Sequence, residues 1–585
     1  MEVIRTAAKV GLEAQRKLAV TSGQKSCSYS QLLTSACQIS SILKTGNFQS
    51  ATVGNFQSAT VGQPTELGYL EKPKEGLSEL QNAFNGTTDL EGARIGIIAK
   101  PSAEFVAGMW ATWISGAVTV PLALSYPQAE LLHVINDAGV SIVMGSDEYH
   151  EILNEIAEKS ASHVYLLPSV PNLVLNSDRP ESSGAEDDTS RNLFKHILAE
   201  IEKSTLIRGN EPALIIYTSG TTGKPKGVVH THNGLNAQVK MLTEAWEYSS
   251  ADQFLQCLPL HHIHGLVNAL LAPLYAGAVV EFMPKFSVRG IWQKWRESYP
   301  TAGIKAENAI TVFTGVPTMY VRLLQGYDVM DPESQKASAA AACQLRLMMC
   351  GSSALPYPIM EQWERITGHR LLERYGMTEF GMALSNPLNG FRKGGTVGKP
   401  LPGVQAKILE EDASSSPQGE GELCIKSPSI FKEYWGQPQV TKESFGDDGY
   451  FRTGDTVKID EDGFFVILGR TSVDILKVGG YKLSALEIEA TILEHPDVSE
   501  CAVLGLPDKE YGEAICAVIV PESEAKKRAE SESKPVITLQ ELHNWAKEKI
   551  APYKIPGLLY VWDSLPRNAM GKVNKKELKK LLLNP

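Results

Sequence analysis

The stretch that decides the fold is Ile215-Ile216-Tyr217-Thr218-Ser219-Gly220-Thr221-Thr222-Gly223-Lys224-Pro225-Lys226-Gly227. The apolar residues 213–216 predict a buried strand, because turn-forming residues end the run. The segment after this strand contains hydroxyl side chains, three glycines and two lysines. Glycines let backbone N–H groups approach an anion closely, and lysines add positive charge. The stretch therefore predicts a strand followed by a loop that binds a polyphosphate.

The loop departs from the Walker A pattern of P-loop kinases and NTPases. That pattern needs four residues between its first glycine and a Gly-Lys-Ser/Thr sequence. Here Gly220 and Gly223 are too close together, and Pro225 follows Lys224. A P-loop enzyme is therefore disfavoured. A polar surface turn is the alternative interpretation, and the two lysines with the preceding buried strand favour phosphate binding over it.

Length and composition indicate a globular protein of more than one domain. A chain of 585 residues exceeds what one hydrophobic core holds. Its 43% hydrophobic and 21% charged residues are ordinary for such proteins. The net charge of −11 argues against a nucleic-acid partner. The eight cysteines form no C-x-x-C pair, which fits a reducing compartment.

We expect no secretory signal and no stable insertion into a membrane. Glu2 and Glu13 are unusual in a mitochondrial transit peptide. The apolar residues 265–280 are interrupted by polar, proline and glycine residues and are short for a membrane span. The expected location is cytoplasmic, with mitochondria as the alternative. The sequence does not determine the oligomeric state, and a monomer is favoured.

The order of the expected elements indicates an α/β fold. Strands and helices alternate at residues 94–99, 104–116, 117–122, 128–138 and 141–144. Such alternation predicts a parallel sheet. From about residue 403, short strands separated by turns suggest a small antiparallel subdomain. We expect a large N-terminal domain (1–469) of mixed parallel sheets with flanking helices plus this subdomain, and a small mobile α/β C-terminal domain (470–585).

Two polar turns follow apolar runs further along the chain. They are Gly351-Ser352-Ser353 and Tyr375-Gly376-Met377-Thr378-Glu379. In open α/β sheets, ligands bind at the carboxyl ends of strands. Tyr375 could stack on a base and Thr378 could bond a phosphate. Glu379 could hold Mg²⁺, which prefers oxygen ligands.

Other polar residues suit a nucleotide site, although each alone is consistent with an ordinary turn or core residue. His261, His262 and His264 have no cysteine or carboxylate nearby, so lining a pocket is favoured over binding a metal. Asp455 suits hydrogen bonds from a ribose diol. Lys572 lies in a glycine turn near the C-terminus.

Together these motifs resemble the adenylate-forming superfamily of acyl-CoA synthetases, adenylation domains and luciferases. The resemblance runs from about residue 20 to the end, and the full set in order is specific. It is carried by the opening loop, Tyr375-Gly376-Met377-Thr378-Glu379, Thr453-Gly454-Asp455, Gly469-Arg470, Gly479-Gly480, Glu487-Ile488-Glu489 and Gly571-Lys572. A closer likeness is to malonyl-CoA synthetases of the plant and mitochondrial branch. It is carried by Leu258-Pro259-Leu260-His261-His262-Ile263-His264-Gly265, Arg346, Leu372-Glu373-Arg374 and Gly469-Arg470-Thr471-Ser472-Val473-Asp474.

The resemblance implies an AMP-forming acid–thiol ligase that uses ATP, Mg²⁺ and coenzyme A. A carboxylate attacks the α-phosphate of MgATP, which gives acyl-AMP and diphosphate. The thiol of coenzyme A then attacks the acyl carbon and expels AMP. Between the two steps the C-terminal domain rotates about a hinge, here near Ser472.

The resemblance also implies roles for individual residues. The β- and γ-phosphates would contact Thr218, Ser219, Gly220, Thr221, Thr222, Gly223, Lys224 and Lys226. Adenine and ribose would contact Gly351, Ser352, Ser353, Tyr375, Gly376, Asp455 and Arg470. Mg²⁺ would contact Glu379 and Thr221. The catalytic residues would be Lys572, which bridges the attacking carboxylate and the α-phosphate, Thr378 at the α-phosphate, and His262, which positions the carboxylate.

Arg346 bears on the choice of acid. It interrupts an apolar stretch, and a charge entering a core is costly unless it is paired. A structural ion pair and a substrate site both satisfy that condition, and the residues alone leave the two open. The resemblance implies that this arginine binds the distal carboxylate through its bidentate fork. The expected acid is malonate, and also methylmalonate.

Three alternatives remain at this stage. A medium-chain or aromatic acyl-CoA synthetase would have a structural Arg346. An adenylation domain that feeds a carrier protein is disfavoured, since no carrier domain follows in this sequence. A non-catalytic nucleotide-binding protein is disfavoured by the presence of Lys572, Glu379 and Asp455.

Overall fold

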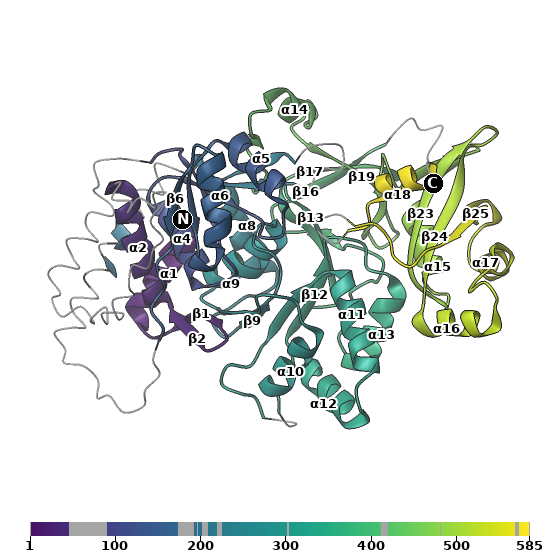
Figure 1. Cartoon of the computed structure of the whole chain (residues 1–585), viewed down its shortest axis with the longest axis horizontal. Coiled ribbons are helices and arrows are strands. Elements are labelled where there is room, and N and C mark those ends of the chain that lie inside the picture. Colours follow the sequence, from purple (N-terminus) through teal and green to yellow (C-terminus); the bar gives the residue numbers. More distant parts are fainter. Residues whose placement is uncertain are drawn as a thin grey trace.

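The computed structural model describes most of the chain. The described residues are 2–45, 90–173, 192, 194–195, 197–199, 201, 209–218, 225–300, 304–410, 419–479, 481–567 and 572–583. Figure 1 shows two neighbouring sheets with their helices, and a separate unit at the C-terminal end, drawn in yellow-green.

The N-terminal sheet confirms the predicted alternation of strands and helices. Its strand order is β18-β8-β7-β4-β3-β5-β6. The strands are β3 (Arg94–Ile98), β4 (Val118–Pro121), β5 (Val140–Gly145), β6 (His163–Leu166), β7 (Pro212–Tyr217), β8 (Gly227–Thr231) and β18 (Glu433–Tyr434). The linking helices are α4 (Ala103–Ile114), α5 (Gln128–Ala138) and α6 (His150–Lys159). Strands β3 to β7 pair in parallel, whereas β8 runs antiparallel to β7.

The central sheet has the order β15-β14-β13-β12-β11-β9-β10-β1-β2. Its parallel strands are β1 (Leu18–Ser22), β9 (Gln253–Gln256), β10 (Val279–Phe282), β11 (Val312–Gly315), β12 (Leu347–Gly351) and β13 (Leu372–Met377). The antiparallel edge strands are β2 (Lys25–Ser28), β14 (Gly381–Ser385) and β15 (Lys399–Pro400). The carboxyl ends of β9, β11, β12 and β13 therefore meet at one edge, where ligands of such sheets bind.

Helices cover both faces of the central sheet, which explains why β12 is a continuous apolar run. On one face, Met348 and Cys350 pack with buried residues of the surrounding helices. These helices are α10 (Val288–Ser298), α11 (Pro317–Asp328), α12 (Pro332–Cys343) and α13 (Tyr357–Thr367). On the other face, Leu347 and Met349 belong to the main core. That core includes residues of α1 (Glu2–Glu13), α2 (Tyr29–Thr45), α8 (His232–Ala245), α9 (Ala272–Tyr275) and the π-helix η2 (His264–Leu271).

The predicted antiparallel subdomain is also confirmed. Its strand order is β16-β17-β19-β20. The strands are β16 (Gln405–Leu409), β17 (Glu420–Lys426), β19 (Phe451–Ile459) and β20 (Phe465–Arg470). Every neighbouring pair in this order is antiparallel.

The C-terminal unit has its own sheet and cores, built from residues between Leu476 and Leu578. The strands are β21 (Ile475–Val478), β22 (Tyr481–Ser484), β23 (Val498–Asp508), β24 (Gly512–Pro521) and β25 (Leu558–Val561). The helices are α15 (Ala485–Ile492), α16 (Ser523–Glu532), α17 (Leu539–Ala546) and α18 (Lys575–Leu583). A small α/β unit at this end was predicted, whereas a domain boundary between residues 469 and 470 stays a prediction. Among the described residues, no helix has the length and apolar character needed to cross a membrane.

One buried carboxyl group makes the stability of the fold depend on pH. Glu373 lies in β13 and is 6% exposed. Burial raises the pKa of its carboxyl from 4.5 to about 8, although the Gly395 N–H donates to it at 3.3 Å. Between these two pKa values the folded chain keeps a proton that the unfolded chain has released. The contribution of this group to stability is therefore complete below pH 4.5 and is lost as pH rises through 8.

We expect Glu373→Gln to remove this contribution. The wild-type unfolding midpoint should fall between pH 5 and pH 8, and the midpoint of the variant should change less over that range. Thermal unfolding at several pH values measures the difference. Glu361→Gln, an exposed change on α13, should keep the wild-type pH dependence. The same pH dependence in Glu373→Gln and wild type would contradict the assignment.

Candidate active site

The carboxyl ends of β12 and β13 bring two predicted motifs together. Ser352 directly follows β12 and has a left-handed φ of 71°. This conformation is costly for a residue other than glycine and occurs preferentially at functional sites. At Gly351, an added Cβ would lie 2.6 Å from the Arg374 carbonyl oxygen, so the close approach of β12 and β13 here requires glycine. Thr378 and Glu379 follow β13 at the same edge.

The ends of the predicted phosphate loop lie beside this edge. The Thr218 N–H donates to the Lys226 carbonyl at 3.0 Å. The Lys226 ammonium lies 5.2 Å from the centre of the Tyr434 ring, and the Tyr434 hydroxyl donates to Glu379 at 2.8 Å. The predicted phosphate-binding residues that lie outside the described residues are Ser219, Gly220, Thr221, Thr222, Gly223 and Lys224.

Three of the residues predicted for adenine and ribose contact one another. Asp455 and Arg470 face each other across β19 and β20, with 3.0 Å between Oδ1 and Nε. The Tyr375 hydroxyl donates to Asp455 Oδ2 at 2.5 Å, and Arg470 Nη1 donates to the Thr453 carbonyl at 2.6 Å. Burial raises the pKa of Asp455, and the Arg470 charge opposes that rise. The ion pair and the hydrogen bond from Tyr375 thus hold the Asp455 side chain and the Tyr375 ring in fixed positions.

Lys572 of the C-terminal unit reaches this cluster. As a whole residue, Lys572 is exposed. Burial by the surrounding protein and the Arg470 charge nevertheless lower the pKa of its ammonium, whereas the Asp455 charge raises it. Burial, together with the charges of His261 and Lys572, lowers the pKa of His262 to about 3. His262 is therefore a neutral hydrogen-bonding side chain at neutral pH. The Lys572 charge thus acts on His262, and the roles of these two residues in joining an acid to a phosphate stay predictions.

A buried arginine that the sequence analysis missed lies next to Ser352. Arg374 of β13 is 2% exposed. Its Nη2 contacts His264, whereas its Nε and Nη1 have no hydrogen-bond partner among the residues that the structure describes. Burial lowers the pKa of this guanidinium to about 10, so it remains charged at neutral pH. The signal in the sequence was a charged residue directly before Tyr375 in β13, the strand that carries the Tyr375 motif.

His264 forms hydrogen bonds with the polar groups around Arg374. Its Nε2 lies 2.7 Å from Thr314 Oγ1 and its Nδ1 lies 3.0 Å from Ser352 Oγ. Burial and the Arg374 charge lower the pKa of His264 well below its usual range, so the ring is neutral. Arginine only donates, so Nε2 accepts and the proton is on Nδ1, which donates to Ser352. The described part of the chain supplies Arg374 with no carboxylate.

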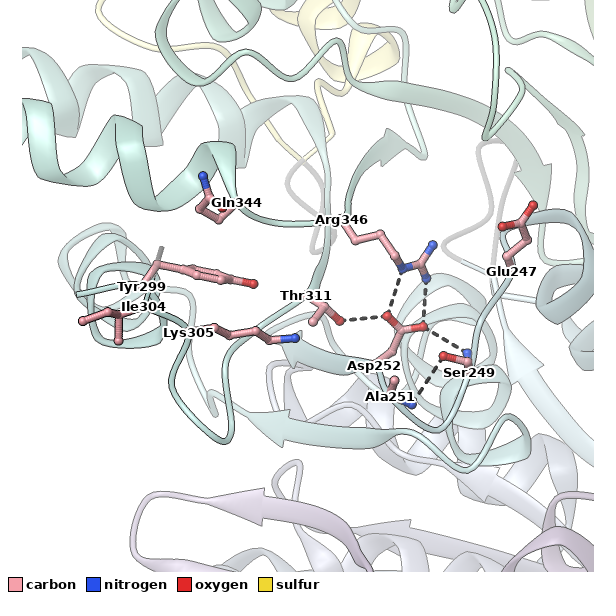
Figure 2. Close-up of a pocket in the computed structure, with 10 residues that line it drawn as sticks. All are labelled: Glu247, Ser249, Ala251, Asp252, Tyr299, Ile304, Lys305, Thr311, Gln344 and Arg346. Carbon is pink, nitrogen blue, oxygen red and sulfur yellow. Dashed lines mark hydrogen bonds and ion pairs between the residues drawn. The ribbon is translucent and has the colours of Figure 1, made fainter. Parts of the chain in front are cut away.

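The structure contradicts the role predicted for Arg346. This residue precedes β12, about 16 Å along the strand from Gly351. Its Nε and Nη2 donate to the two oxygens of Asp252 at 2.9 and 2.8 Å. Figure 2 shows this bidentate pair in a surface pocket of about 380 Å³. Arg346 therefore forms a structural ion pair at the edge of the sheet opposite to the nucleotide cluster.

Three further predicted residues lie in or after strands β12, β13 and β20. Gly376 lies in β13, where an added Cβ would overlap the Gly381 backbone. Ser353 is exposed after Ser352, and Ser472 is exposed in the turn that follows β20. Their roles in nucleotide binding and in the hinge stay predictions.

The chain is similar to known proteins over its whole length. The AMP-binding enzyme family matches residues 90–435, and the C-terminal domain of AMP-binding enzymes matches residues 487–572. The malonate–CoA ligase of Arabidopsis thaliana is 58% identical over 584 residues, which cover 100% of this chain and 89% of that protein.

The chain also resembles solved structures over nearly its full length. The crystal structure of ATP-bound MatB from Rhodopseudomonas palustris has a TM-score of 0.75 at 29% identity, with 99% of both chains covered. A malonyl-CoA ligase ternary product complex with methylmalonyl-CoA and AMP has a TM-score of 0.57 at 30% identity, with 94% of this chain and 97% of that chain covered.

The chain belongs to the AMP-binding enzyme family. Within that family it is an AMP-forming acid–thiol ligase, with the mixed α/β fold and small C-terminal unit that the sequence predicts.

Arg346→Gln should lower stability without changing the recognition of the acid. It leaves Asp252, whose side chain is 4% exposed, without its guanidinium, which should cost about 2 kcal/mol. Urea unfolding measures this loss, and the KM for the acid in ATP–diphosphate exchange should stay at the wild-type value. Arg289→Gln, an exposed change on α10, is the matched control. A large rise in KM with unchanged stability would restore the original role of Arg346.

Lys572→Ala should separate the two half-reactions. Loss of one preorganised donor should slow acyl-adenylate formation by about a hundred- to a thousand-fold. The variant should still convert supplied acyl-AMP and coenzyme A to acyl-CoA. Single-turnover assays of each half-reaction measure both rates, and Lys576→Ala, exposed on α18, serves as control. Equal losses in both half-reactions would rule out this role.

Proposed function

We propose that the chain is an ATP-dependent malonate–CoA ligase that also accepts methylmalonate. The reaction converts malonate, ATP and coenzyme A into malonyl-CoA, AMP and diphosphate through malonyl-AMP. The observation that carries the choice of acid is Arg374, a buried guanidinium with unsatisfied Nε and Nη1 atoms at the site. The 58% identity to the malonate–CoA ligase of Arabidopsis thaliana supports the same choice.

Arg374 binds the distal carboxylate of the acid in this proposal. A buried cation without a carboxylate is costly, and a bound carboxylate relieves that cost with charge-assisted hydrogen bonds. His264 holds one side of the guanidinium, so Nε and Nη1 remain for the substrate. Ser352 and Thr314, both bonded to His264, fix its ring. A monocarboxylate would leave Arg374 unpaired, and sites of this kind discriminate by about 10⁴.

The proximal carboxylate reacts at the α-phosphate. Its oxygen forms a bond to phosphorus while the bond to the leaving diphosphate breaks. Lys572 bridges this carboxylate and the phosphate, Thr378 contacts the α-phosphate, and neutral His262 orients the acid by hydrogen bonding. Asp455, Arg470 and Tyr375 hold the nucleoside. Since phosphoryl-type transfer needs little covalent help, positioning and charge carry the rate enhancement.

The residues fit a Mg²⁺ ion that arrives with ATP. The ion commonly binds one or two carboxylates together with substrate phosphates, and Glu379 is 7% exposed beside the ends of the phosphate loop. Bound Mg²⁺ would neutralise charge on the leaving diphosphate. Glu379 would hold it, with Thr221 as the second predicted ligand.

We also propose a domain boundary, a hinge, a cellular location and an oligomeric state. We place the domain boundary between residues 469 and 470, with the hinge near Ser472. A cytoplasmic monomer is the proposed state. The exposed turn at Ser472, between the antiparallel sheet and the C-terminal unit, supports the hinge.

ATP–diphosphate exchange with malonate, methylmalonate, succinate, acetate and octanoate tests the proposal. We expect malonate and methylmalonate to react fastest, with acetate about 10⁴-fold slower. Arg374→Met should lose most exchange with malonate and little with acetate, because only the distal carboxylate loses its partner. Arg374→Lys is the control that keeps the charge. Faster exchange with acetate or octanoate would refute malonate as the substrate and leave the ligase class intact.

A further inference from the structure

A buried ion cluster lies in the segment that carries Lys572. Lys575 begins α18, and its ammonium is 2.6 Å from Asp474 Oδ1 and 2.7 Å from Glu489 Oε1. The three side chains are 11–13% exposed. Glu489 Oε1 also accepts the Val503 N–H at 2.7 Å, which ties the cluster to β23.

Local preferences do not explain a lysine at this position. A positive charge in the first turn of a helix opposes the helix dipole, and burial of an ion is costly unless it is well paired. Burial lowers the pKa of Lys575, yet Glu489 and Asp474 raise it overall, so the ammonium stays charged. A residue that breaks a local rule and recovers its cost through specific partners indicates a functional constraint.

The cluster connects Lys572 to the turn after β20. Asp474 Oδ2 accepts the Arg470 N–H at 2.9 Å, and Arg470 pairs with Asp455. Lys572 stands three residues before Lys575. The residues between them are held as well, because the Asn574 N–H donates to the Pro566 carbonyl at 2.8 Å. A short, restrained segment thus joins the cluster to an ammonium whose charge acts on Asp455 and His262.

We propose that Lys575 is a positioning residue for Lys572. Its ammonium, held by Asp474 and Glu489, fixes the start of α18 against the turn after β20 and thereby sets where Lys572 lies when the acyl-adenylate forms. This inference rests on the proposed role of Lys572 in the first half-reaction. The second half-reaction does not use Lys572, so it does not need this restraint.

The test measures both half-reactions in the full-length protein. Lys575→Met should slow malonate-dependent ATP–diphosphate exchange by about a hundredfold, the effect of a displacement near 1 Å. Its conversion of supplied malonyl-AMP and coenzyme A should stay near the wild-type rate, which also shows that it folds. Lys575→Arg, which keeps the charge, should recover most of the exchange rate. Lys579→Met is the matched control on the same helix, because Lys579 only forms a 3.4 Å pair with Glu513 and is 38% exposed.

Equal losses in both half-reactions, or no loss of exchange, would overturn the positioning role. If Lys575→Met does not fold, Glu489→Gln replaces it, since glutamine keeps an acceptor for the Val503 N–H and removes one charge. A wild-type protein without malonate-dependent exchange would instead refute the proposed substrate. Loss of exchange in Lys579→Met as large as in Lys575→Met would show a general effect of α18 and overturn the inference.

Discussion

The ion pair between Asp455 and Arg470 is the interaction on which the active site depends. The pair joins Asp455 in β19 to Arg470 in β20, and Asp455 also accepts a hydrogen bond from the Tyr375 hydroxyl. The charges of both partners act on Lys572. The backbone N–H of the same arginine bonds Asp474 at the start of the C-terminal unit. One pair therefore connects Tyr375, the turn between the two units and Lys572. Loss of Arg470 is the costly change, because the Asp455 side chain is 8% exposed and would become an uncompensated buried charge, whereas the Arg470 side chain is 37% exposed.

The electrostatics of the site separate fixed charges from neutral hydrogen-bonding groups. Arg374, Arg470 and Lys572 supply positive charge where a dicarboxylate and a polyphosphate must meet. The histidines next to them are neutral, because burial and these same cations lower their pKa values. Neutral rings can hold defined tautomers, as the bonds of His264 to Ser352 and Thr314 indicate. Charge and orientation are thus supplied by different residues.

The sequence predicted most of the fold because many of the parallel strands contain runs of buried apolar residues, as in β4, β5 and β12. Strand β12 is buried on both faces and could not be confused with a surface element. Most of the nucleotide motifs lie at strand ends, so their meeting at one edge follows from the parallel arrangement. Arg346 and Arg374 both place a charge in or beside an apolar strand, and sequence could not distinguish them. The ion pair with Asp252 identifies Arg346 as a structural residue, and Asp252 lies 94 residues earlier in the chain. The Lys575 cluster depends in the same way on residues far apart in sequence, which meet only after the C-terminal sheet has formed.

Among the described residues, no carboxylate pairs with the buried guanidinium of Arg374, and this charge bears on the stability of the folded chain. Without its acid, the folded state carries a buried charge that the unfolded chain would expose to water. Any carboxylate that neutralises this charge binds only the folded state and shifts the folding equilibrium toward it by mass action. With Arg374 as the residue that binds the acid, an abundant acid would lower the unfolded fraction that is exposed to proteases in a cell. A residue that selects the acid would in this way also match the amount of enzyme to the amount of acid.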